Sequence, residues 1–152
     1  MSKIDKQKAP RASGTRYPAP FDQPCRAREW LRLGDAAGLT QFGVNLLHLP
    51  PGAWSSQRHW HSHEDEFVYV LEGELTLITD AGEQVLTPGL AAGFPAGVPD
   101  GHNLVNKTDK DALDLEIGNR HPEEEAHYPD VDLHVRRSGG AFNFTRKDGS
   151  AI

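Results

Sequence analysis

Three histidines at alternate positions are followed by a carboxylate in the stretch from His59 to Gly73, which reads HWHSHEDEFVYVLEG. In an extended chain alternate side chains share a face, so His59 and His61 point to one side and Trp60 to the other. After a short connection, Glu66 begins a run of β-branched and aromatic residues that favours a strand. If the two strands pair as a hairpin, two imidazoles and a carboxylate converge at its end. This pattern predicts part of a metal site that needs one more ligand.

A second pairing of the histidines is open, because His63 continues the alternation and could act together with His61. That pairing leaves only two residues before the carboxylate. A two-residue hairpin loop needs positive φ angles that glycine or asparagine supplies and that glutamate resists. Pairing His59 with His61 leaves the four-residue loop 62–65, which can form a type I turn. The sequence therefore favours this first frame, with His63 exposed in the turn at the rim of the site.

Composition excludes several classes of partner. The formal net charge of −6 argues against nonspecific binding to nucleic acid or to an anionic membrane, because both require a basic surface. No apolar run approaches the ~20 residues that span a bilayer, and the N-terminus lacks the apolar core of an export signal. Cys25 is the single cysteine, which rules out an internal disulfide and fits a reducing compartment. We expect a cytoplasmic protein with no nucleic-acid or membrane partner.

The distribution of glycine and proline predicts an all-β fold. The 15 glycines and 11 prolines interrupt every window in which a helical apolar stripe could form. A chain of 152 residues fits one domain, and short strands separated by turn signals suggest a closed sandwich or barrel. Strands are expected at residues 30–33, 39–49, 54–61, 66–71, 75–79, 84–87, 90–94, 102–106, 113–117, 131–135 and 142–144. The strands 66–71 and 75–79 are expected to form a hairpin.

The chain divides into three parts by composition. Residues 1–27 hold four prolines that break regular structure and are predicted to form a mobile or loosely docked N-terminal arm. Residues 28–120 are predicted to form the barrel. Residues 121–152 form a C-terminal extension, expected to pack on the barrel or on a dimer partner. Within it, the acidic run Glu123–Glu125 is interpreted as a solvated turn.

Two stretches resemble, in order, the two motifs of the cupins: G-x6-HxH-x4-E-x6-G over residues 52–73, and G-x5-P-x-G-x4-H-x3-N over residues 89–106. The glycines of residues 52 and 97 lie slightly further from the histidines than in the usual pattern, which alters loops at the rim. The resemblance implies a double-stranded β-helix, or jelly-roll, barrel with a metal ion at its centre. The ligands that it implies are His59, His61, Glu66 and His102.

The chemistry of this ligand set agrees with the resemblance. Three neutral imidazoles and one carboxylate suit a single divalent transition metal ion such as Zn, Mn, Fe or Ni. The absence of a thiolate disfavours a structural zinc site, and open coordination positions leave room for an oxygen-bearing ligand. The remaining histidines lack a partner at ligand spacing and are predicted not to bind the metal: His48, His121, His127 and His134.

The first functional hypothesis is a metal-dependent enzyme that holds a small oxygenated substrate in the barrel, with a sugar or sugar-phosphate isomerase or epimerase as the leading candidate. In that reaction the metal polarises a carbonyl while a nearby base moves a proton. The alternatives are a non-haem iron dioxygenase and a non-catalytic small-molecule-binding protein. A sugar phosphate requires a cation near the metal, and only Arg58, Lys107 and Arg120 are close to the motifs in sequence. Arg58 alternates with His59 and is expected to point away from the metal.

The strand that begins at Glu66 is apolar on both faces. Val68 and Val70 share the inward side of Glu66, and an antiparallel strand open to water would alternate with polar residues. The outward positions are Phe67, Tyr69 and Leu71. Either the C-terminal segment 131–144 or a second subunit must cover them. We favour a two-fold homodimer, because identical apolar patches bury one another in an isologous contact.

Overall fold

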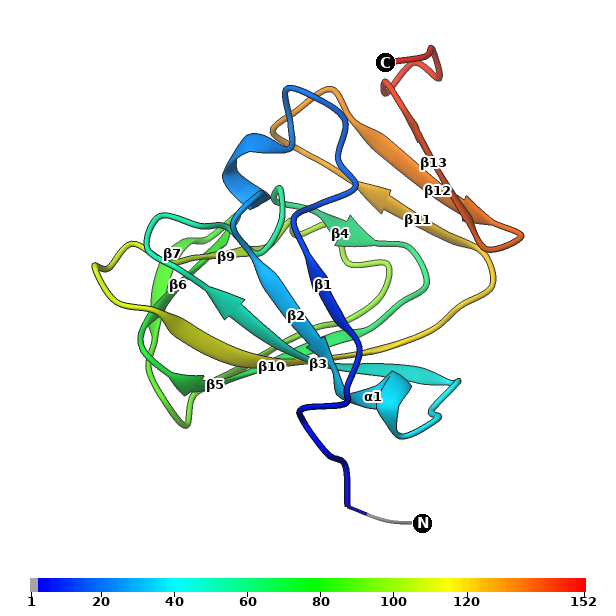
Figure 1. Ribbon diagram of the computed structural model, residues 1–152. Helices are drawn as coiled ribbons and strands as arrows, with labels where there is room; N and C mark the ends of the chain where they lie inside the picture. The colour runs from blue at the N-terminus through cyan, green and yellow to red at the C-terminus, as the bar shows by residue number, and fades with distance from the viewer. Residues whose placement is uncertain (1–2) are drawn as a thin grey trace.

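The computed structural model describes residues 3–152, which form three antiparallel sheets with little helix (Figure 1). The six-stranded sheet has the order β1 (Arg11–Ser13), β2 (Glu29–Arg32), β3 (Phe42–Leu49), β10 (Ala112–Asn119), β5 (Glu66–Glu72) and β8 (Ala91–Phe94). The four-stranded sheet has the order β13 (Ala141–Thr145), β12 (His134–Ser138), β11 (Glu124–His127) and β4 (Trp60–His61). The three-stranded sheet has the order β7 (Gly82–Leu86), β6 (Leu75–Thr79) and β9 (Asn103–Val105). The helical segments are η1 (Gln23–Cys25) and α1 (Leu33–Ala36). Within residues 3–152, no helix combines the length and apolar character needed to cross a membrane.

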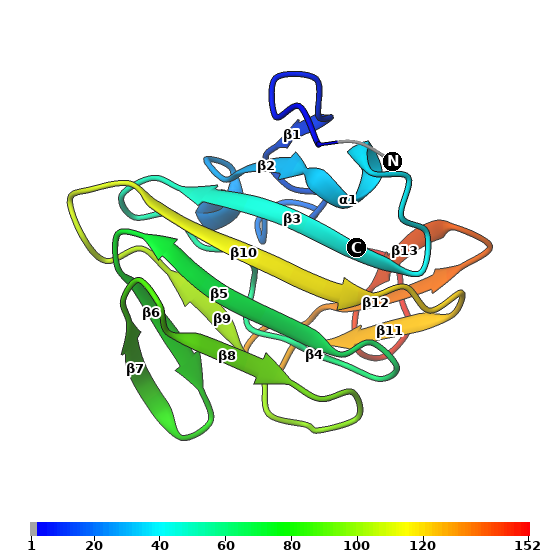
Figure 2. The same cartoon turned by 90° about the horizontal axis from the view of Figure 1, so that it is seen from below.

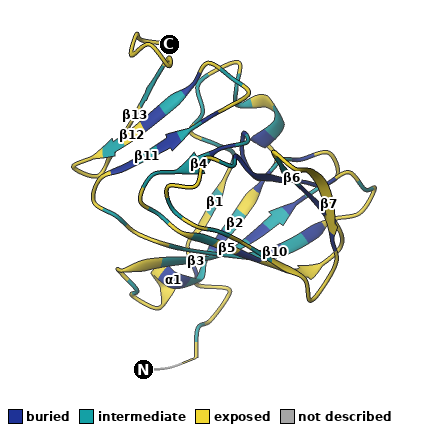
Figure 3. Cartoon of the chain, turned by 180° about the vertical axis from the view of Figure 1, so that it is seen from behind, coloured by how far each residue is buried: buried dark blue, intermediate teal, exposed yellow. Residues whose placement is uncertain are grey.

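Two apolar cores hold the sheets together. Figure 2 shows the six-stranded sheet with the three-stranded sheet at one end and the four-stranded sheet at the other. The first core joins the six-stranded and three-stranded sheets through residues such as Leu47, Val70, Leu75 and Leu104. The second packs the C-terminal strands against aromatic residues of the arm. The outer strand β7 is exposed along most of its length (Figure 3). The all-β class predicted from the sequence is confirmed.

Both hairpins predicted around β5 are wrong. Strand β4 pairs with β11, whereas β5 pairs with β10 and β8, so the histidines and the carboxylate come from different sheets. Strand β6 likewise pairs with β7 and β9 rather than with β5. Gly73, at φ +76°, lets the chain cross between sheets, and a Cβ there would lie 2.5 Å from the carbonyl oxygen of Asp111. The crossing therefore needs glycine for close packing as well as for its backbone angle.

The predicted strand 54–61 is mostly a loop. Only Trp60–His61 is a strand, and Trp54 and His59 form isolated bridges with Val105 and His102. The intervening residues 55–57 are buried although they are polar. Their backbone and side chains bond to the arm and to the neighbouring strand β9, for example through Gln57 Nε2, which donates to Phe21 O at 2.7 Å. The buried polar groups of this loop form hydrogen bonds with these specific partners, in place of the backbone hydrogen bonds that a regular strand would form with its neighbours.

Residues 9–27 of the N-terminal arm contact the barrel, beginning with the buried Ala9. Strand β1 pairs with β2 from Arg11 to Ser13. The ring of Tyr17 packs edge-on against Tyr128 and Phe144, with ring centroids 5.7 and 6.0 Å apart. These partners lie more than a hundred residues away along the chain, so local composition could not indicate the contacts of the arm.

The prediction of a solvated acidic turn at Glu123–Glu125 is wrong. Strand β11 begins at Glu124, which is 5% exposed, and Ala126 is buried beside it. The following strand, β12, lies at His134–Ser138, later than the predicted 131–135. The last strand, β13, contains the predicted segment 142–144.

Strand β10 turns its acidic side inward and its apolar side outward. Asp114 is completely buried, and Glu116 shares its inward side. The apolar side chains of Leu115 and Ile117 instead lie on the outer face, opposite Tyr69 and Phe67 of β5. The outward orientation of Phe67, Tyr69 and Leu71 is as predicted, since they are 42, 38 and 43% exposed. The C-terminal strands belong to another sheet and leave this face open.

The buried carboxyl group of Asp114 leads to a prediction about stability. Neither of its oxygens has a hydrogen-bond partner among residues 3–152, and burial raises its pKa well above the usual value. A raised folded-state pKa favours folding below the unfolded-state value near 4, and this contribution is lost as the pH rises towards the folded-state value. Asp114→Asn is therefore expected to stabilise the protein by more than about 1 kcal/mol at pH 8 and to have little effect at pH 4. Urea unfolding of both proteins across this range measures the difference.

Asp109→Asn is the matched control, because Asp109 is exposed and its substitution should leave the free energy of unfolding unchanged. A difference between the Asp114→Asn protein and wild type that stays constant from pH 4 to 8 would contradict the prediction.

Candidate metal centre

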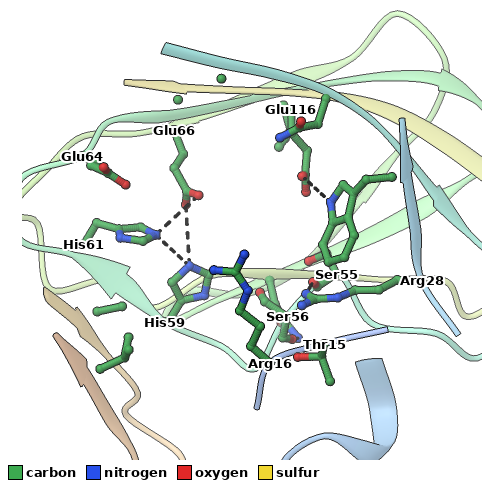
Figure 4. A pocket seen from close by; sticks show the side chains of 18 of the residues that line it. Thr15, Arg16, Arg28, Ser55, Ser56, His59, His61, Glu64, Glu66 and Glu116 are labelled. Carbon is green, nitrogen blue, oxygen red and sulfur yellow. Dashed lines mark hydrogen bonds and ion pairs between the residues drawn. The ribbon is translucent and has the colours of Figure 1, made fainter. Parts of the chain in front are cut away.

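The structure brings the four predicted ligands together at one end of the barrel. His61 lies on β4, His59 just before it, Glu66 at the start of β5 and His102 just before β9. The Nε2 atoms of His59 and His61 are 3.0 Å apart. The oxygens of Glu66 lie 2.7 Å from His102 Nε2, 3.4 Å from His61 Nε2 and 3.7 Å from His59 Nε2. Figure 4 shows the side chains of His59, His61 and Glu66 converging on one point.

The hydrogen bonds of the rings turn nitrogen lone pairs towards this point. His59 Nδ1 lies 2.9 Å from the carbonyl oxygen of Gln57, which only accepts, so Nδ1 carries the hydrogen. In a neutral ring the lone pair is then on Nε2. His61 Nδ1 faces the carboxylate of Glu124 at 3.7 Å, which favours the same tautomer. At 3.0 Å the two Nε2 atoms can share a proton, and a divalent metal ion can replace that proton when both rings are neutral, so the donor set fits such an ion.

The charges of the cluster are consistent with this interpretation. Burial lowers the pKa of His59 to about 3, and the charge on His61 adds to the effect. Burial also disfavours charge on His61, but the carboxylates of Glu66 and Glu124 outweigh it and raise the pKa of His61 to about 10. Burial favours a neutral Glu66, yet His61 and His102 hold the pKa of Glu66 well below its usual range. The carboxylate of Glu66, with its side chain 33% exposed, is balanced by positive charge, a role that a metal ion can take while the ring proton is released.

Glu124 fixes the turn that separates the histidines from Glu66. Its Oε1 accepts hydrogen bonds from the backbone N–H groups of Ser62 and His63 at 2.8 and 3.2 Å. His63 is exposed in this turn, stacked on His121 with ring centroids 4.7 Å apart, as the first frame predicts. Sequence reasoning missed Glu124. The available signal was alternation, since Glu124, Ala126 and Tyr128 are buried while the residues between them are not.

A pocket of about 740 Å³ opens beside the ligand cluster. Glu116, on β10, lines this pocket together with Glu66 and the ring of Trp30. Trp30 Nε1 donates a hydrogen bond to Glu116 Oε2 at 3.2 Å. Burial, together with the charge of Glu66, raises the pKa of Glu116 to about 7. The pocket thus combines possible metal ligands with a carboxyl group that can exchange a proton near neutral pH.

The comparisons with known proteins agree with this architecture. The family model described as "Cupin domain" matches residues 45–118. The crystal structure of a sugar phosphate isomerase from a cupin superfamily, from Silicibacter pomeroyi DSS-3, has 50% identity and a TM-score of 0.96, over 99% of this chain and 96% of that chain. This chain belongs to the cupin superfamily. The predicted jelly-roll barrel class is thereby confirmed.

Two further structures are similar to this cupin. A protein from Acidithiobacillus ferrooxidans ATCC 23270, assigned as a sugar phosphate isomerase, has 31% identity and a TM-score of 0.76, over 83% of this chain and 80% of that chain. The polyketide cyclase RemF from Streptomyces resistomycificus has 20% identity and a TM-score of 0.62, over 78% of this chain and 79% of that chain, which supports the fold alone. A search of curated proteins returned no match.

A second group of possible ligands lies outside the barrel of this cupin. Atoms of Glu125, His127 and His134 lie within 4.8 Å of one another, because the two histidines are direct partners across β11 and β12. Spacing along the chain could not indicate this cross-strand pair. The carboxylate of Glu125 forms an ion pair with Arg136, whose Nη2 lies 2.6 Å away. The guanidinium group of Arg136 therefore already neutralises the charge that a metal ion would need.

The three cations suggested from sequence do not supply a free charge to the pocket. Arg58 points away from the metal cluster, as predicted, and donates to both oxygens of Asp130 at 2.8 and 2.7 Å. Lys107 binds Glu83 at 2.7 Å and lies outside the pocket lining. Arg120 does line the pocket but is paired with Asp35.

Proposed function

We propose that this cupin is a metal-dependent isomerase or epimerase of sugar phosphates. The observation that carries the proposal is the position of Glu116, a half-buried carboxyl group in the same pocket as the four possible metal ligands. The sugar phosphate isomerase from S. pomeroyi, at 50% identity, supports the choice of reaction class. The cluster of His59, His61, Glu66 and His102 would hold one divalent transition metal ion.

The strand register supports a shared substrate position between Glu66 and Glu116. Gly118 of β10 is the direct partner of Glu66, and Glu116 is the partner of Val68. Glu66 and Glu116 are therefore diagonal neighbours on the inward face, where such positions lie about 7–8 Å apart. A substrate carbon can fit between a metal ligated by Glu66 and the carboxyl group of Glu116.

The chemistry assigned to Glu116 is a proton transfer between carbon atoms. A bound metal ion would supply Lewis-acid polarisation of the substrate carbonyl. As a carboxylate, Glu116 takes the proton from the carbon next to the carbonyl and returns it to the former carbonyl carbon, while the hydroxyl proton moves between the two oxygens. In an epimerisation Glu116 would exchange the proton at a single carbon. Trp30 holds the carboxyl group by its hydrogen bond during both transfers.

The proposal is tested by incubating the metal-reconstituted protein with a panel of aldose and ketose phosphates in D2O. Interconversion of isomers, with deuterium incorporated at the carbon next to the carbonyl, is the expected result. Substrate-dependent O₂ consumption by the iron-loaded protein would instead indicate the dioxygenase. Binding of the sugar phosphates without deuterium exchange would indicate a non-catalytic binding protein.

We also propose that a second copy of this chain covers the outer face of β5 and β10. This face presents Phe67, Tyr69 and Leu71 next to Leu115 and Ile117, while β10 places its carboxyl groups inside. An apolar patch of this kind on one side of a sheet is self-complementary about a two-fold axis. Sedimentation at micromolar concentration is expected to show a dimer.

A matched pair of variants tests this interface. Leu115→Arg is expected to give monomers, whereas Val85→Arg, which replaces an exposed apolar residue of β7, should leave the dimer intact. A wild-type protein that sediments as a monomer at micromolar concentration would contradict the proposed interface.

A further inference from the structure

Five arginines line the pocket, and they differ in how their charge is balanced. Arg32 and Arg120 form ion pairs with Asp35, and Arg137 forms one with Glu64. The remaining two are Arg16 and Arg28. Within residues 3–152 neither forms an ion pair, so the pocket holds two positive charges without a carboxylate partner.

Arg28 is a buried cation in a fixed position. Its side chain is 9% exposed, its Nε donates to the carbonyl oxygen of Gly14 at 2.9 Å, and Nη1 donates to the carbonyl oxygen of Ser55. Its guanidinium carbon lies 4.2 Å above the ring of Trp30. Glu116 is bound to the same ring system but forms no ion pair with Arg28. A guanidinium stays charged in proteins, and a buried charge without a counter-ion is costly. An anionic ligand group would balance it.

Arg16 adds a second cation from the docked arm. Figure 4 shows its side chain extending into the pocket towards His59, on the same side as Thr15, Arg28 and Ser56 and across from Glu116. The guanidinium carbon of Arg16 lies 4.8 Å from the centre of the Phe142 ring, which also lines the pocket.

Hydroxyl groups complete the environment of the two arginines. Thr15 Oγ1 accepts a hydrogen bond from the backbone N–H of Tyr17 at 3.1 Å, which leaves its own O–H free to donate. The side chain of Ser56 lines the pocket on the same side and is 8% exposed. This side of the pocket therefore offers donors and positive charge, whereas the opposite side carries Glu66 and Glu116.

We propose that Arg16 and Arg28, with the hydroxyl groups of Thr15 and Ser56, bind the phosphate group of the substrate. A phosphate monoester carries a charge near −2 and three acceptor oxygens, which two guanidinium groups and two hydroxyls can satisfy. The inference rests on the proposed function and adds to it the orientation of the substrate. The phosphate lies against the arm, and the carbonyl end lies between the metal ligands and Glu116.

Calorimetric titration of the metal-loaded protein with inorganic phosphate tests this subsite. Arg16→Ala is expected to weaken phosphate binding by about tenfold or more, because it removes a charge-assisted contact. Arg11→Ala is the matched control, since it removes an exposed cation from the same arm outside the pocket and should have no effect. Arg16→Lys should restore part of the affinity. Repeating the titrations after chelation separates this site from phosphate bound to the metal, because binding at the arginines persists.

Equal phosphate affinities of the Arg16→Ala and Arg11→Ala proteins would overturn the subsite, as would complete loss of binding on chelation. Arg28→Lys is a second test variant, because it keeps the buried positive charge but removes the planar guanidinium group. It should also weaken the binding of phosphate. The two proposals can fail separately. Isomerisation by wild type with unchanged phosphate binding in Arg16→Ala overturns only the subsite, and phosphate binding at Arg16 without proton exchange overturns only the isomerase.

Discussion

Glu116→Gln is expected to lower kcat for sugar-phosphate isomerisation by about 10²–10⁴-fold, the usual contribution of a general base. Glutamine has the size of glutamate, and its amide oxygen can still accept the hydrogen bond from Trp30. It cannot take up a proton from the substrate. Metal content and phosphate affinity should stay at the wild-type level, since Glu116 belongs to neither group of ligands. Steady-state kinetics on the metal-reconstituted proteins, with metal analysis of the same samples, measure the effect.

The pH profile separates this role from a structural one. Glu116 must be ionised to act as a base, and its pKa is about 7, so kcat/KM of wild type should rise with pH through this region and then level off. A bound divalent cation moves the rising limb to lower pH. The limb should be absent from the residual activity of Glu116→Gln. Glu72→Gln, which changes an exposed carboxyl group at the end of β5, is the control and should behave as wild type. Wild-type turnover in Glu116→Gln would contradict the assignment.

The ligand cluster was accessible from sequence, but the rest of the pocket was not. His59, His61 and Glu66 are close in sequence, and the resemblance to the second cupin motif added His102. Arg16, Arg28 and Glu116 carry no such signal, because they enter the pocket from the arm and from neighbouring strands of the six-stranded sheet. Local composition indicated a loosely attached arm, while the contacts that dock it come from aromatic residues near the C-terminus.

Alternation predicted strands well but not their partners or their inward faces. In β10 the period of two separated Leu115 from Asp114 and Glu116, yet the carboxyl groups face inward and the leucines outward. A period identifies two faces, and only the surroundings decide which one is buried. The same limit applies to the predicted hairpins. Strand β5 is apolar on both sides and is adjacent to β10 and β8, and β4 pairs with a strand about sixty residues further along the chain.

Removing the predicted metal ligands one at a time is expected to distinguish the two possible histidine frames. His59→Ala, His61→Ala and His102→Ala should each lose most of the bound metal, because each removes a nitrogen donor within the cluster. His63→Ala should keep near-stoichiometric metal, because this exposed ring stacks on His121 and belongs to none of the groups of possible ligands among residues 3–152. Metal analysis after gel filtration, together with circular dichroism to confirm folding, gives the comparison.

Glu124→Gln should fall between these extremes. Its carboxylate lies 3.7 Å from His61 Nδ1 and holds the turn through Ser62, but it is outside the group that would contact the ion. Residues that orient a ligand in this way typically change metal affinity by about 10–100-fold, which competition with a chromogenic chelator can measure. We therefore expect the His63→Ala protein to bind metal most tightly, the Glu124→Gln protein less tightly, and the three ligand variants most weakly. A His63→Ala protein that loses its metal while His59→Ala retains it would show that the second frame is the correct one, and the cluster built around His59 would then need a different function.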